Sequence, residues 1–116
     1  MAQDRPSAGE LLEAVREFLE REVLPTGEAR RQFLARVSVN ALAIVERELV
    51  LGAAADTREL GRLRALLGQD GELSELNAAL AAAIRAGRFD ERDGRLMAHL
   101  KATTADKLAI ANPKYR

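Results

Sequence analysis

The sequence predicts an all-α fold, a compact bundle of about five helices with the second helix central, formed by a single domain over residues 1–116. Three observations predict this class. Apolar residues recur at three- and four-residue spacing in several segments, which is the period of a helix with one buried face. Gly and Pro separate these segments, and sequences typical of helix starts precede several of them. Nowhere do β-branched residues alternate over five or more positions between turn markers, as a strand would require.

The first predicted helix begins with a capping box, in which the Ser7 and Glu10 side chains satisfy each other's free backbone amides. Pro25 ends this helix, because proline has no amide donor and disfavours helical geometry in the residue before it. Thr26 is then predicted to cap the second helix, which runs to about Leu51 and stops at Gly52.

The segment from Phe33 to Leu51, FLARVSVNALAIVERELVL, is the predicted centre of the bundle. On a helical wheel it is apolar on nearly every side, and only a narrow arc near Ala35 and Glu46 is expected to face solvent. A helix of this kind is usually buried all round. The other helices are therefore expected to pack about this segment.

The remaining helices follow from similar start and stop signals. The 78–86 run AALAAAIRA allows either a close helix crossing within the chain or an alanine patch against a partner chain. Residues 1–6 and 113–116 are expected to be loose tails. The expected elements are a short helix that begins at Asp56–Glu59 and ends at Gly68, a helix from Glu72 to Ala86 ended by Gly87, and a helix from Glu91 to Ala111 capped by Asp90 and ended by Asn112–Pro113.

Composition excludes several classes of function. Basic and acidic residues number 18 each, so no overall field attracts nucleic acid or an anionic membrane. Without cysteine there is no disulfide, thiolate nucleophile or cysteine-bound metal. No apolar run, such as residues 41–45, approaches the roughly 20 residues of a membrane span, and the N-terminal sequence does not resemble a signal peptide. We therefore expect a soluble, cytoplasmic protein with no nucleic-acid or membrane partner.

The sequence contains no recognisable catalytic motif. His99 is the only histidine, and Leu96 stands where a helical di-metal site would place a carboxylate. There is neither a phosphate-binding G-x-x-x-x-G-K-[ST] loop nor a G-x-G-x-x-G loop. We therefore expect no catalytic, cofactor-binding or metal-binding residue and favour a protein that is not an enzyme. His99 itself is expected to lie partly exposed at the edge of the last helix.

A tentative polar cluster is predicted where charged or amide side chains interrupt the apolar arcs of the second and fifth helices. A buried charge needs a partner, so Glu48 and Lys107 are expected to meet, with Asn40 bonding backbone or Thr103. Three interpretations stay open: pairing that fixes helix register, plain exposure to solvent, or a pocket for a phosphate or carboxylate. The cluster comprises Arg36, Asn40, Arg47, Glu48, His99 and Lys107.

Three blocks of the sequence resemble an uncharacterised family of short bacterial helical proteins, classed as a domain of unknown function. They are QDRPSAGELLEAVREFL (3–19), FLARVSVNALAIVEREL (33–49) and ADKLAIANPKY (105–115). Members of that family are often encoded near a kinase of the aminoglycoside phosphotransferase type and near an acyl-CoA dehydrogenase. The resemblance implies an accessory protein for one of these enzymes, with no catalytic residue to carry over.

The sequence thus leaves two classes of function and one assembly open. The first is a non-catalytic accessory or interaction protein for a phosphotransferase-like kinase or an acyl-CoA dehydrogenase. The second is a small-ligand binder or minor enzyme, with a polar pocket between the second and fifth helices. A homodimer, formed through the alanine-rich helix or an exposed side of the second helix, is the third alternative.

Overall fold

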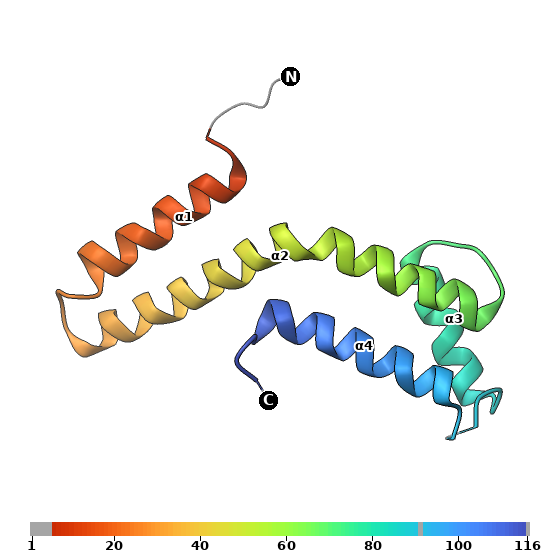
Figure 1. Ribbon diagram of the computed structural model, residues 1–116. Helices are drawn as coiled ribbons and strands as arrows, with labels where there is room; N and C mark the ends of the chain where they lie inside the picture. Colours follow the sequence, from red (N-terminus) through yellow and green to blue (C-terminus); the bar gives the residue numbers. More distant parts are fainter. Residues whose placement is uncertain (1–5, 91, 116) are drawn as a thin grey trace. The chain divides into compact units, whose positions relative to one another are not determined.

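The computed structural model describes residues 6–90 and 92–115, and these residues form helices and connecting turns with no strand. In order, the elements are α1 (Ala8–Phe18), the π-helix η1 (Leu19–Val23), α2 (Ala29–Leu67), α3 (Leu73–Arg85) and α4 (Gly94–Ala111) (Figure 1). The all-α class is confirmed, but four α-helices replace the five that the sequence predicts.

The chain divides into two compact units, Met1–Val50 and Leu51–Arg116, called unit 1 and unit 2 below. Helix α2 runs through both units. The prediction of one domain over residues 1–116 is not tested by this division and stays a prediction. Each unit is described by itself.

The predicted capping box at the start of α1 is confirmed. The Ser7 hydroxyl accepts a hydrogen bond from the Glu10 amide at 3.2 Å, and the Glu10 carboxylate accepts one from the Ser7 amide at 2.9 Å. The helix then widens into η1, where the Leu24 amide donates to the Leu19 carbonyl at 2.8 Å. This five-residue spacing is that of a π-turn, and helical structure ends before Pro25, as predicted.

Thr26 does not cap α2. Its hydroxyl donates to the carbonyl oxygens of Glu22 and Val23, at 3.1 and 3.4 Å, and so closes the preceding turn instead. Gly27 then adopts φ 98°, a left-handed conformation that glycine accepts without steric cost. Helix α2 begins after this turn, at Ala29.

The predicted end of the second helix at Gly52 is wrong, because α2 continues for 39 residues to Leu67. A glycine inside a helix costs about 1 kcal/mol relative to alanine, and the three alanines that follow Gly52 favour continuation. Thr57, which the sequence places at the start of a third helix, donates to the Ala53 carbonyl at 3.0 Å, as threonines inside helices often do. The left-handed terminator is Gly68, with φ 66°.

The prediction that residues 33–51 are buried all round is also wrong. Phe33 is 62% exposed and Val50 is 78% exposed, whereas Ala35, assigned to the solvent arc, is 5% exposed. In unit 1, α1 lies antiparallel beside the first half of α2 (Figure 1). Two helices can cover only one side of each other, and the side of α2 that faces α1 is the Ala35–Glu46 arc.

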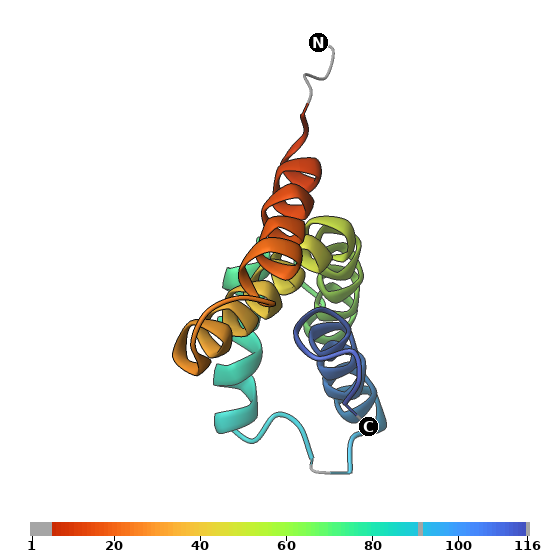
Figure 2. The ribbon, with the colours of Figure 1, turned by 90° about the vertical axis from the view of Figure 1, so that its left-hand side faces the viewer.

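Unit 2 contains the leucine core of the chain. Leu63, Leu76, Leu80 and Leu96 are buried together, and they come from α2, α3 and α4. Helix α4 runs antiparallel along the second half of α2 (Figure 1). Figure 2 shows α3 and α4 as two separate helices of this unit. Three helices thus share one small core.

The boundaries of α3 and α4 follow the predicted turn signals closely. Gly87, with φ 79°, follows the end of α3, and α4 ends before Asn112–Pro113. The cap of α4 differs from the prediction: Asp93 accepts from the amides of Arg95 and Leu96, whereas Asp90 accepts from the Arg92 amide in the preceding turn. Glu91, the predicted first residue of this helix, lies outside the described residues.

Candidate functional site

The six residues of the predicted polar cluster fall in different surroundings. His99 is buried and Arg47 is half-buried, while the other four are exposed. The Glu48–Lys107 and Asn40–Thr103 contacts would each join unit 1 to unit 2, and both stay predictions. Unit 1 contains Arg36, Asn40, Arg47 and Glu48, and unit 2 contains His99 and Lys107.

Among the described residues of unit 2, His99 is the buried polar one, with 3% of its surface exposed. Its Nδ1 accepts a hydrogen bond from Arg62 Nε at 3.1 Å, so the ring proton resides on Nε2. Burial lowers the pKa of His99, as does the neighbouring Arg62 charge, with Glu59 opposing in part. The expectation of a partly exposed His99 is therefore wrong, because α4 turns this residue toward α2.

Arg62 connects α2 to α4 and was not among the predicted site residues. Its Nη2 donates to Thr103 Oγ1 at 3.1 Å, in addition to the bond from Nε to His99. One turn earlier on α2, Arg58 Nη2 binds Asp106 Oδ1 at 2.9 Å. Arginines four residues apart thus face acceptors at matching helical spacing on α4. That spacing is the sequence signal that could have identified this contact.

A groove of about 430 Å³ lies beside this contact, between α2 and α4. We call it the α2–α4 groove. Its polar lining consists of two arginines and one histidine, and none of the described carboxylates lines it. The rest of the lining is apolar and small, which leaves room for a ligand body. The lining residues are Arg62, Ala65, Leu66, Arg95, Ala98, His99 and Ala102.

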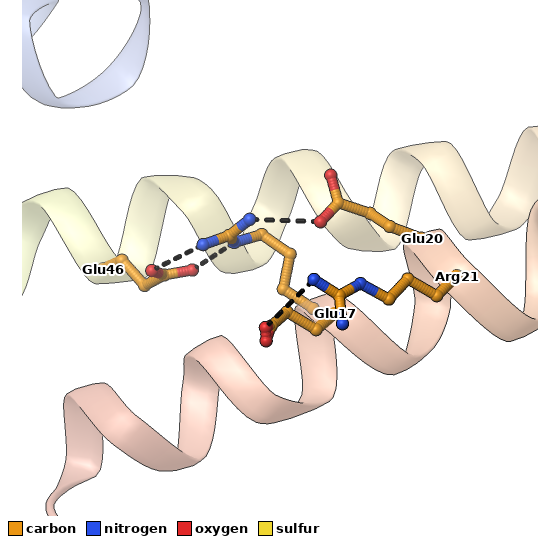
Figure 3. A network of polar contacts seen from close by, with 5 residues as sticks. Glu17, Glu20, Arg21 and Glu46 are labelled. Atoms are coloured by element: carbon orange, nitrogen blue, oxygen red, sulfur yellow. Dashed lines mark hydrogen bonds and ion pairs between the residues drawn. The ribbon is translucent and has the colours of Figure 1, made fainter.

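Unit 1 is held together by an arginine that bridges its helices (Figure 3). Arg16 donates to both carboxylate oxygens of Glu46, from Nε at 2.7 Å and from Nη2 at 3.3 Å, and its Nη1 reaches Glu20 at 3.1 Å. The bond from Arg16 lowers the pKa of Glu46 and raises the pKa of Arg16, with desolvation opposing both shifts. Arg21 and Glu17 form a longer pair nearby, at 4.0 Å. The Arg16–Glu46 pair joins α1 to α2, whereas the other two pairs lie within the α1–η1 segment.

The hairpin also presents a broad apolar surface, which we call its apolar face. Nine large apolar side chains of α1 and α2 expose between 37% and 62% of their surface. Exposed apolar surface of this extent commonly marks a site of interaction. Six of these side chains, Leu11, Val15, Phe18, Leu34, Val45 and Leu49, form the apolar face, whereas Phe33, Val37 and Ile44 lie on the side of α2 away from α1.

Two features of the described residues bear on other functions. Residues 6–90 and 92–115 contain no group of three or more His, Asp or Glu that could hold a metal ion. In the same part of the chain, no helix combines the length and the apolar character needed to cross a bilayer.

The described part of the chain is all-α, with a helical hairpin in unit 1 and a small leucine core beside a groove in unit 2. It belongs to the family of the domain of unknown function DUF6285, whose family model matches residues 25–115. The predicted resemblance to a domain of unknown function is thus confirmed. The matched range includes α2, α3 and α4, and hence the whole α2–α4 groove, whereas α1 precedes it. No curated protein and no solved structure matches the chain.

Proposed function

We propose that this chain is a cytoplasmic, non-catalytic interaction protein that binds another protein through the apolar face of its hairpin. The observation that carries the proposal is the exposure of that face. Among the described residues of unit 1, Ala35 is the only buried one, whereas Leu34 and Val45 on α2 are about half exposed. Apolar surface left in water is surface that a partner can bury favourably.

The exposed side chains form stripes rather than a scatter. On α1, Leu11, Val15 and Phe18 follow helical spacing, about a quarter turn from the half-buried stripe that includes Arg16. On α2, the exposed stripe with Leu34 and Val45 lies about a third of a turn from the side that faces α1, rotated in the same sense as on α1. Because the two helices run antiparallel, equal senses of rotation place both stripes on the same side of the hairpin.

The area of this face is a substantial part of what a specific complex buries. Full burial of a side chain such as Leu, Val or Phe removes roughly 60–120 Å² of apolar surface from water. The six half-exposed side chains of the face therefore offer roughly 200–350 Å² of apolar surface. A standard interface buries about 800 Å² on each partner, a little over half of it apolar. The face thus supplies roughly half or more of the apolar area of such an interface.

The partner that we propose is a phosphotransferase-like kinase or an acyl-CoA dehydrogenase-like protein. This choice comes from the resemblance described above and not from the geometry of the hairpin. A second copy of the chain would bury the same apolar face. A homodimer and a complex with another protein differ in mass, so a measurement of the mass of the complex distinguishes them.

The proposal is tested by quantitative mass spectrometry of proteins that co-purify with the tagged full chain from its native host. The double variant Leu34→Glu with Val45→Glu places two charges on the apolar face. The matched control is Val50→Glu, which adds the same side chain at a 78% exposed position off the stripe. We expect the wild type and the control to retain a kinase-like or dehydrogenase-like protein that the double variant loses.

Circular dichroism establishes that all three proteins keep their helical content, so that lost binding does not reflect unfolding. Light scattering on the purified chain tests the second copy as partner. Retention of the same proteins by the double variant would contradict the proposal. The proposal would also be contradicted if the wild-type chain is monomeric and retains no protein that the double variant loses.

A further inference from the structure

The polar lining of the α2–α4 groove consists of hydrogen-bond donors with positive or neutral charge. Arg62 and Arg95 contribute guanidinium groups, and His99 contributes an imidazole whose Nδ1 already accepts from Arg62. The ring therefore offers its Nε2–H as a donor. No carboxylate of residues 6–90 and 92–115 lines the groove to compensate these charges.

The two arginines are weakly neutralised by the described residues around them. The bonds of Arg62 in this part of the chain go to neutral acceptors, the His99 ring and the Thr103 hydroxyl. Arg95 lies 3.9 Å from Asp93, whose same carboxylate oxygen also caps α4 by accepting backbone amides. Guanidinium groups bind carboxylates and phosphates more strongly than neutral acceptors.

Arg62 is also already oriented. It is half-buried, and two hydrogen bonds to α4 hold its guanidinium plane. A side chain fixed in this way loses little conformational freedom when a ligand binds, which favours affinity. The remaining wall of the groove is formed by alanine and leucine side chains.

We propose that the α2–α4 groove binds an organic anion, in which a carboxylate or phosphate group is attached to a small apolar body. The anionic oxygens face Arg62 and Arg95, and the apolar body lies on the alanine-rich wall. The groove volume of about 430 Å³ falls within the usual range for small-ligand sites. The groove lies in unit 2, so this site is independent of the hairpin's apolar face.

The single histidine of the chain provides a direct test on the full-length protein. Its ring resonances in an NMR spectrum are unambiguous, and His99 lines the groove. Four probes are titrated: hexanoate, hexyl phosphate, hexanol and inorganic phosphate. We expect a saturable shift of the His99 resonances with at least one of the two organic anions, and binding at least about tenfold weaker for hexanol and inorganic phosphate. Comparison of hexanoate with hexyl phosphate shows which anionic group the site prefers.

Three substitutions separate the groove from general charge effects. Arg95→Gln removes one anion-binding group from an exposed position and is expected to weaken binding about tenfold. Arg85→Gln removes the same charge from an exposed site of unit 2 outside the groove and should leave binding unchanged. Ala98→Leu keeps every charge but fills part of the groove, and it should also weaken binding.

Saturable binding of an organic anion that depends on Arg95 and on Ala98, but not on Arg85, would support the proposal. The absence of a saturable shift with both organic anions would overturn it. Equal affinity for hexanol, or equal weakening by the Arg95 and Arg85 substitutions, would overturn it as well. None of these results depends on whether the hairpin binds a protein.

Discussion

Replacing Leu63 with alanine should destabilise unit 2 more than any other single truncation on α2. Leu63 is completely buried and contacts leucines from α3 and α4. The change removes three carbon groups, which corresponds to a loss of about 2.4 kcal/mol at 0.8 kcal/mol each. A residual cavity adds to this loss, so we expect about 3–4 kcal/mol in the free energy of unfolding. For a domain of this size, that corresponds to a fall in Tm of more than about 10 °C.

Urea denaturation followed by circular dichroism measures this free energy. Leu49→Ala is the matched control, because it makes the same change in the same helix at a position that is 53% exposed. The control should cost about 1 kcal/mol or less, since less apolar surface is lost from the interior. Equal costs for the two substitutions would refute the assignment of the core to unit 2.

Three further predictions concern glycine conformation and titration. Gly61→Ala, inside α2 with open space around it, should stabilise the chain by roughly 0.5–1 kcal/mol, whereas Gly68→Ala, at φ 66°, should destabilise it by about 1 kcal/mol; thermal unfolding measures both. His99 has a pKa below the ordinary 6.5, so folding stability should fall as the pH decreases below that value, because the unfolded chain binds the proton more readily. His99→Gln should remove this component from urea unfolding curves recorded on either side of that pH, and an unchanged pH dependence would contradict the reasoning. The pKa of Glu46 lies below the ordinary 4.5, so its bond with Arg16 stabilises unit 1 above that pH and is lost as the pH falls through the lowered value. Glu46→Gln should therefore reduce the acid sensitivity of unit 1, measured by hydrogen exchange of the α1 amides.

Local signals in the sequence predict much of the secondary structure. The Ser7–Glu10 capping box, the stop before Pro25 and the break at Gly87 depend on side chains and backbone geometry within a few residues of each other. Such interactions need no tertiary information. They are therefore the features that the structure confirms most directly.

The predicted helix end at Gly52 was wrong because glycine occurs both inside helices and at their ends. Gly68 has positive φ and ends α2, whereas Gly52 lies inside the same helix. A short sequence window does not distinguish them, since each glycine follows an apolar run. The decisive difference is the context downstream, where alanines follow Gly52 and the non-helical residues 69–71 follow Gly68.

The predicted burial of residues 33–51 was wrong for a different reason. The apolar composition of a helix shows how much of its surface would be buried favourably, but not whether other helices cover that surface. The arc from Ala35 to Glu46 looked like the least apolar side of α2, yet it packs against α1 because a small residue allows close approach and Arg16 supplies a partner for Glu46. Long-range pairing of this kind is set by tertiary structure.

The α2–α4 groove was not predicted from the sequence. His99 was placed in the polar cluster, but its hydrogen-bond partner Arg62 was not among the predicted site residues. The matching spacing of Arg58 and Arg62 on α2 with Thr103 and Asp106 on α4 is visible in the sequence. It becomes informative only when two helices are known to run antiparallel in that register.

The π-turn of η1 has a consequence for how this chain tolerates changes in length. A π-turn encloses one more residue between its bonded carbonyl and amide than an α-turn does. Deleting one residue between Leu19 and Val23 would let the segment close as an ordinary α-turn, with no change in the preceding helix. Insertions and deletions usually accumulate in loops, but here a helical segment itself carries a spare residue.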